Sequence, residues 1–263
     1  MLIEIGLTTF YAEQISYIIL AVFLLVVFRK ILIENDIHIK KLVSFSSIPA
    51  KNIIIALTIS FLSVPLALGF NAIEVLFIAQ FSLEMAANLW DFKLQEVVLE
   101  RNYKLGGSIG VFLLFALVHS IIGPLVEELT FRAPLLSKRQ SKYTLLGAIF
   151  ISSVLFTIIH SNKQYLELFI FSLFVAFLTI KTGRILYAFI VHAGYNLFSW
   201  LMEGHNMMLL FTNKPIDSLH KITLWKGELI FMIISLILII FLLKALLKGN
   251  NEKQFRVSNT VVQ

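Results

Sequence analysis

The sequence predicts an all-α, polytopic transmembrane helical bundle of seven to eight spans with a polar intramembrane cavity. First, 58% of the 263 residues are hydrophobic and only 14% are charged, which is more apolar surface than a soluble domain of this length could bury. Second, several apolar runs reach roughly 20 residues, the length of helix that crosses the hydrocarbon core. Third, acidic, basic and histidine side chains recur at helical spacing inside these runs. Because an unpaired backbone is not tolerated in lipid, we expect helices whose polar side chains face inward.

Seven apolar segments are expected to be membrane-spanning helices. In chain order they are residues 14–29, 52–70, 108–136, 143–161, 165–181, 185–203 and 228–247. Residues 73–90 have two interpretations, because Glu74, Gln80, Glu84 and Asn88 fall near one helical face. This pattern suits either an eighth span inside the bundle or an amphipathic helix at the interface, and we favour eight spans.

The ends of the chain and its charges bear on topology. The N-terminus has Glu4 and Glu13 in place of a basic region, so the first apolar run is expected to be an anchor rather than a removable signal. The net charge of +6 gathers in the connectors and the C-terminal tail, which predicts a cytoplasmic C-terminus. The basic loop at 29–51 lies outside if there are eight spans, and inside if 73–90 does not span.

Composition also limits the classes of function and location. The chain has no cysteine, which excludes disulfides, thiolate metal sites and a cysteine nucleophile. The basic residues are expected to contact membrane lipid, since no soluble domain is available to bind nucleic acid. The many Ile, Lys, Phe and Asn residues suggest a bacterial source. We therefore expect a multi-pass protein of the bacterial cytoplasmic membrane.

Two glutamates and an arginine interrupt the apolar segment GPLVEELTFR. Glu128 and Arg132 are four residues apart with the acid first, the favourable order for a helical ion pair. Glu127 lies about 100° around the helix, without an obvious local partner. A buried carboxylate of this kind can serve as a general base. The alternative is that both acids are structural and pair with basic groups elsewhere.

Two further polar pairs occur at helical spacing in later segments. Phe156 and His160 end the run IFISSVLFTIIH, and His192 and Asn196 lie in the middle of RILYAFIVHAGYNLFSW. A histidine at a helix end can be an interfacial or capping residue, and a mid-membrane histidine and asparagine can join helices by hydrogen bonds. They can equally line a cavity and face a substrate carbonyl. Three such clusters in three helices favour the cavity.

Together these motifs resemble those of the CAAX-protease and bacteriocin-processing family, also called the type II CAAX prenyl endopeptidase or Abi group. EELTFR matches E-E-x-x-x-R, FTIIH matches F-x-x-x-H, and HAGYN matches H-x-x-x-N, in the same order. The resemblance implies that Glu127 activates water, that His160 orients or polarises it, and that His192 and Asn196 hold the oxyanion. It implies supporting roles for Glu128 and Arg132.

The resemblance also implies a division of the chain and a class of reaction. We expect N-terminal transmembrane helices at 1–107, the catalytic core at 108–203, and a connector, last helix and polar tail at 204–263. The expected activity is an intramembrane endopeptidase that cleaves a small peptide precursor or a membrane-associated protein, as in bacteriocin processing or peptide maturation. The competing hypothesis is a non-catalytic membrane partner, such as a bacteriocin-immunity factor or a sensor-kinase modulator.

Two further expectations concern the cofactor and the geometry of the site. We expect no cofactor; zinc is the alternative, because two histidines and a carboxylate are ligand types that suit it, although the HExxH helix is absent. A histidine at the end of a helix beginning near Tyr143 lies about 25 Å along that helix. A tilted or displaced helix, or a register shift at Gly123-Pro124, is then needed to bring His160 to Glu127.

Overall fold

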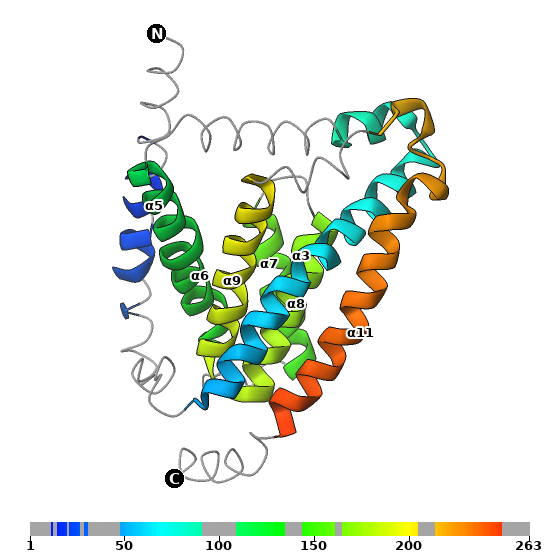
Figure 1. Cartoon of the computed structure of the whole chain (residues 1–263). Coiled ribbons are helices and arrows are strands. Elements are labelled where there is room, and N and C mark those ends of the chain that lie inside the picture. The colour runs from blue at the N-terminus through cyan, green and yellow to red at the C-terminus, as the bar shows by residue number, and fades with distance from the viewer. Residues whose placement is uncertain are drawn as a thin grey trace.

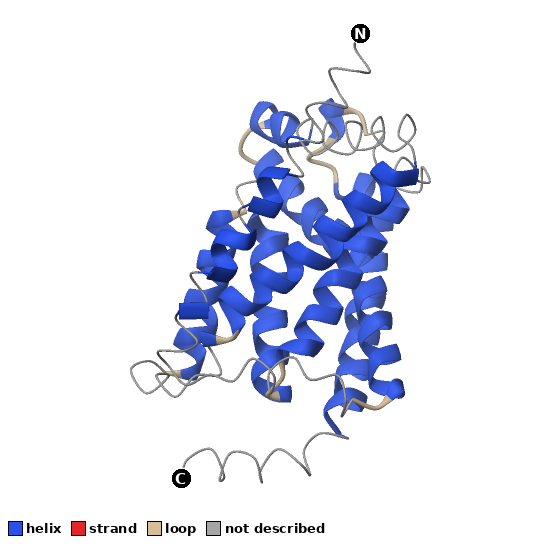
Figure 2. Cartoon of the chain, turned by 90° about the vertical axis from the view of Figure 1, so that its left-hand side faces the viewer, coloured by secondary structure: helices blue, strands red, loops and turns tan. Residues whose placement is uncertain are grey.

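The computed structural model shows a helical protein. The residues that it describes are 12, 15–19, 21–26, 29–30, 48–90, 109–134, 144–160, 165–204 and 214–248. Regular structure in these ranges is helical throughout, and they contain no strand. The all-α fold class predicted from composition is therefore confirmed for the described part of the chain (Figure 2).

The helices of the described residues differ in length. Their bounds are α3 (Ala50–Ala79), α5 (Ile109–Leu117), η1 (Val118–Ile122), α6 (Gly123–Arg132), α7 (Leu145–Ile159), α8 (Tyr165–Thr182), α9 (Ile185–Gly204), η4 (Ile216–Ser218), η5 (Ile222–Trp225) and α11 (Lys226–Lys248). Four described helices are long and apolar enough to cross a membrane: Ala50–Ala79, Tyr165–Thr182, Ile185–Met202 and Ile222–Lys248. Shorter apolar helices occur at Ile15–Val26 and Leu145–Ile159. These lengths support a membrane location.

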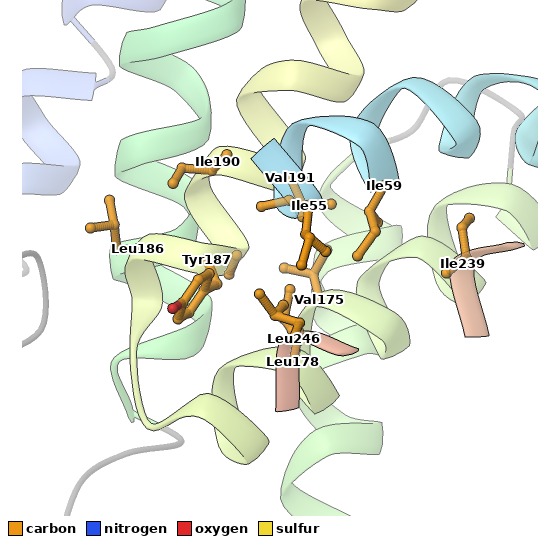
Figure 3. Close-up of a cluster of buried hydrophobic side chains, with 12 residues drawn as sticks. Ile55, Ile59, Val175, Leu178, Leu186, Tyr187, Ile190, Val191, Ile239 and Leu246 are labelled. Carbon is orange, nitrogen blue, oxygen red and sulfur yellow. The ribbon is translucent and has the colours of Figure 1, made fainter. Parts of the chain in front are cut away.

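Helix α9 occupies the centre of the bundle. It contacts α3, α8, α6 and η1, while α11 packs along the opposite side of α3 and α7 packs on α8 (Figure 1). The largest core cluster lies where α3, α8, α9 and α11 meet, and includes Ile59, Leu178, Leu186 and Leu246 (Figure 3). The outward side of α11 exposes a row of isoleucines, leucines and phenylalanines. Such a large apolar surface is typical of contact with lipid.

Glycines allow α3 to approach its two neighbours closely. A Cβ atom at Gly194 of α9 would lie 2.5 Å from the Ser60 Oγ on α3. At Gly69 of α3, a Cβ would lie 2.3 Å from the Cβ of Met232 on α11. Small residues at such contacts let helix backbones pack tightly in membranes. Because Gly194 lies between His192 and Asn196, this contact fixes the part of α9 that carries both candidate site residues.

Residues 73–90 do not form one separate helix, and neither interpretation of this segment is confirmed. Residues 73–79 continue α3, which runs without interruption from Ala50 to Ala79. The chain turns at 80–82, and a short helix at 83–90 begins where the Ser82 hydroxyl accepts a hydrogen bond from the Met85 N–H. The apolar side of this short helix, including Trp90, packs on Trp225. The expected span ended at residue 70 because about 20 residues are enough to cross the hydrocarbon core, whereas α3 continues to Ala79.

The expected long helix at 108–136 is observed as three consecutive segments. α5 leads into the π-helical turn η1, which is followed by α6. Pro124 lies in the first turn of α6, where a proline is tolerated. The Gly123 N–H donates to the Val118 carbonyl, five residues back, as in a π-helix. The Gly123-Pro124 pair therefore marks a real change of register, directly before the glutamates.

Candidate active site

The ion pair expected from the E-E-x-x-x-R spacing is present in α6. Arg132 Nε lies 3.2 Å from Glu128 Oε2, and both side chains are fully buried. The guanidinium also donates from Nη2 to the Ser172 Oγ on α8 at 3.1 Å, and lies 4.6 Å from the centre of the Phe156 ring. Arg132 thereby ties α6 to both α7 and α8. Burial of this charge is made possible by its carboxylate partner and by the aromatic ring beside it.

The second carboxylate oxygen of Glu128 orients His192. His192 Nδ1 on α9 lies 2.9 Å from Glu128 Oε1. Because Glu128 is paired with Arg132 and can only accept, His192 carries its proton on Nδ1 in this contact. The opposite ring nitrogen, Nε2, lies 3.6 Å from Glu127 Oε2. A carboxylate that holds one imidazole nitrogen and leaves the other for chemistry is the arrangement of the serine-protease triad.

His160 approaches the same carboxylate from the end of α7. Its Nδ1 lies 2.8 Å from the Phe156 carbonyl, which can only accept, so the ring donates from Nδ1. His160 Nε2 then lies 3.4 Å from Glu127 Oε2. The imidazole stacks on the Phe156 ring at 4.1 Å with an interplanar angle of 26°. The F-x-x-x-H pair is therefore one structural unit: the phenylalanine supplies both the stacking surface and the carbonyl that sets the tautomer.

Glu127 and Glu128 differ sharply in exposure although they are adjacent. The Glu127 side chain is 26% exposed and His160 is 27% exposed, whereas Glu128 is fully buried and His192 is 5% exposed. One oxygen of Glu127 faces the Nε2 atoms of two histidines, and the side chain as a whole is accessible to water. Glu127 is thus the carboxylate that can meet a water molecule, and Glu128 is sealed behind it.

Asn196 lies on the same helix as His192, one turn further along, but its amide has a backbone partner. Asn196 Nδ2 donates to the His119 carbonyl in η1 at 2.8 Å. The structure thus brings Glu127, His160 and His192 directly together and joins Asn196 to the helix that carries Glu127. The catalytic roles expected for these residues remain predictions.

The expected obstacle between His160 and Glu127 is absent. α7 contains 15 residues and ends at Ile159, and the π-helical turn shifts α6 relative to α5. Thr144 caps the N-terminus of α7 by accepting from the Gly147 N–H at 3.2 Å. With these ends, α7 places His160, the residue that follows it, beside Glu127.

A second buried polar cluster adjoins the site, and the sequence analysis did not identify it. The carboxylate of Glu167, in the first turn of α8, accepts hydrogen bonds from the Tyr195 hydroxyl and, at 2.6 Å, from the Asn71 amide. Phe171 contacts both the His192 ring and the Tyr195 ring. The sequence did contain a signal for this cluster, because Glu167 is an acidic residue inside a long apolar helix.

Zinc is the alternative cofactor for this site. Two histidine Nε2 atoms and a carboxylate oxygen are ligand types that zinc accepts. However, the described residues include no group of three or more His, Cys, Asp or Glu side chains arranged to hold a metal ion.

The fold defines a helical membrane protein in which two glutamates and two histidines lie close together. Residues 109–198 match the family model of type II CAAX prenyl endopeptidase Rce1-like proteins. Over 91 residues the chain is 35% identical to "Putative membrane peptidase YdiL" of Bacillus subtilis (strain 168), a stretch that covers 34% of this chain and 37% of that protein. The chain thus matches little more than a third of this relative's length. No solved structure matches the chain. This match over residues 109–198 confirms the resemblance recognised from the motifs.

Proposed function

We propose that this protein is an intramembrane endopeptidase in which Glu127 activates the hydrolytic water. The observation that carries the proposal is the position of the Glu127 carboxylate, which is partly exposed and lies 3.4 Å and 3.6 Å from the Nε2 atoms of His160 and His192. A positioned base of this kind contributes about 10²–10⁴-fold to a proton-transfer step. The domain match and the peptidase relative support the same reaction class.

Each side chain of the site has one role in the proposed reaction. Glu127 takes a proton from water as the water oxygen attacks the carbonyl carbon, and returns it to the leaving nitrogen when the carbon–nitrogen bond breaks. His160 orients the water through Nε2. His192, when protonated, donates from Nε2 to the oxyanion, and the Glu128 carboxylate at Nδ1 stabilises the imidazolium. Asn196 has a second amide hydrogen available for the same oxyanion.

The finer architecture and the biological setting belong to this proposal. They comprise a multi-pass bundle of seven to eight spans in the bacterial cytoplasmic membrane, a polar cavity around Glu127, and a catalytic core at 108–203 flanked by 1–107 and 204–263. The proposed substrate is a small peptide precursor or a membrane-associated protein. The family name adds prenylated CAAX peptides as a substrate class to be tested.

The proposal is tested by comparing protein termini in membranes of a bacterial host that expresses either the wild-type chain or an empty vector. We expect new N-termini, at positions inside or beside apolar segments, in the wild-type sample. A quenched-fluorescence peptide that spans one such position should then be cleaved by the purified protein in proteoliposomes, alongside a farnesylated CAAX peptide as a second probe. Unchanged termini and an intact farnesylated CAAX peptide would instead indicate a non-catalytic membrane partner.

Removal of metal is expected to leave the activity intact. Two neutral imidazoles and one carboxylate, placed on three separate helices, are not a preformed closed zinc site. The purified protein should therefore contain well under one equivalent of zinc, measured by elemental analysis, and keep its cleavage rate after prolonged chelation. A rate that disappears on chelation and returns with stoichiometric zinc would transfer the activation of water to a metal ion.

A further inference from the structure

The contact between Asn196 and the main chain of η1 lies at an interruption of the helix. In an α-helix the His119 carbonyl would accept from the amide of residue 123, and in a π-helix from the amide of residue 124. The Gly123 N–H donates to Val118 instead. Residue 124 is a proline, which has no amide hydrogen. The Asn196 amide, 2.8 Å from the His119 oxygen, supplies from α9 the donor that the proline lacks.

This turn is also the support for the Glu127 side chain. Glu127 follows Pro124 by three residues, and a Cβ atom built on Gly123 would lie 3.7 Å from Glu127 Oε1. The carboxylate therefore lies back over the turn that Asn196 holds. A π-turn carries one residue more than an α-turn, so it sets the direction in which every following side chain points. A change in the conformation of this turn would therefore displace the carboxylate of Glu127.

We propose that Asn196 is a positioning residue that holds the π-turn at Pro124, and thereby fixes the Glu127 carboxylate between the two histidines. This inference rests on the proposed function in that Glu127 is taken as the base. Asn196, the asparagine of H-x-x-x-N, would then act by holding the backbone of η1. This role is separate from any contact with the oxyanion. A misplacement of about 1 Å in a catalytic group costs on the order of 10²-fold in rate, so such an action can account for a large effect of Asn196.

Restoring the missing amide provides a sharp test. Pro124→Ala gives residue 124 an N–H that can donate to the His119 carbonyl, and so makes the Asn196 contact dispensable. The register of α6 is kept in this variant by the buried contacts of Arg132 with Glu128 and Ser172 further along the helix. The experiment therefore compares four full-length proteins: wild type, Asn196→Ala, Pro124→Ala, and the double variant. Pro124→Ser restores the same amide, and replaces the alanine variant if the latter does not accumulate.

The first measurement is hydrogen–deuterium exchange of the segment 118–127 in lipid nanodiscs, which requires no substrate. Asn196→Ala should accelerate exchange in this segment, and the acceleration should be largely reversed in the double variant. Ser152→Ala is the matched control, because the Ser152 hydroxyl also donates across helices to a carbonyl of α6, that of Phe131 at 3.0 Å. This control should leave exchange at 118–127 unchanged. Equal acceleration by Asn196→Ala with and without Pro124 would overturn the inference.

The second measurement is cleavage of the quenched peptide. Asn196→Ala should lower kcat on the order of 10²-fold with little change in KM, and by a much smaller factor when Pro124 is already alanine. The loss that remains in the Pro124→Ala background measures the contribution of the second amide hydrogen at the oxyanion. Equal losses in both backgrounds would overturn the positioning role even if exchange is rescued. A wild-type protein that cleaves nothing would contradict the proposed function, while the exchange measurement still decides whether Asn196 holds the turn.

Discussion

Glu127→Gln should lower peptide cleavage by about 10²–10⁴-fold, because it removes the only proton acceptor in the proposed mechanism. Glutamine keeps the size and shape of glutamate, so the packing over Gly123 and against α7 and α9 is retained. Its amide nitrogen can donate to a histidine Nε2, but cannot take a proton from water. We therefore expect a protein that inserts, accumulates and unfolds like wild type, and that has lost its activity.

Glu128→Gln is the matched control for this result. The two glutamates are adjacent on α6, but Glu128 is fully buried and is bound to Arg132 and His192. Its replacement should lower stability, since the Arg132 charge loses its partner, whereas Glu127→Gln should not. Turnover, expression and thermal unfolding, measured for both variants, separate the two roles. Normal processing by a folded Glu127→Gln protein would exclude the general-base role.

The contacts of the site that were predictable from the sequence are those set by local spacing. Glu128 and Arg132 are four residues apart, and the spacing alone predicts the ion pair that the structure contains. Phe156 and His160 are joined in the same way, through stacking and through the Phe156 carbonyl. We also predicted that the three helices bring their polar residues together. The reason is the cost of polar groups in lipid, which favours one shared interior over three isolated sites.

The features that the sequence analysis missed depend on distant parts of the chain. The partner of Asn196 is a backbone carbonyl of His119 on another segment, and side-chain patterns carry no information about carbonyls. Glu167 was passed over because its partners, Tyr195 and Asn71, lie on α9 and α3. The predicted extent of α3 was also wrong. We expected a helix just long enough to cross the hydrocarbon core, whereas α3 has 30 residues.

The buried ion pair gives the prediction with the largest expected effect on stability. Arg132→Met should lower the free energy of unfolding by about 3–5 kcal/mol, because it leaves the fully buried Glu128 carboxylate without its cation. The same variant removes the donor to Ser172 and the cation over the Phe156 ring, so α6 also loses its attachment to α7 and α8. Unfolding in mixed micelles with increasing dodecyl sulfate measures the change.

Two comparison variants make this prediction specific to the buried pair. Lys181→Met removes an exposed cation that lies 5.6 Å from the Phe177 ring, and should change the stability by no more than about 1 kcal/mol. The double variant Glu128→Gln/Arg132→Met removes both charges and should recover much of the loss, because replacing a buried ion pair by neutral groups is often close to neutral in stability. If Arg132→Met were no less stable than Lys181→Met, Glu128 would have to be neutral in the folded protein. A neutral Glu128 would present a hydroxyl donor to His192 Nδ1 in place of an acceptor, and the tautomer that turns His192 Nε2 toward Glu127 would be lost with it.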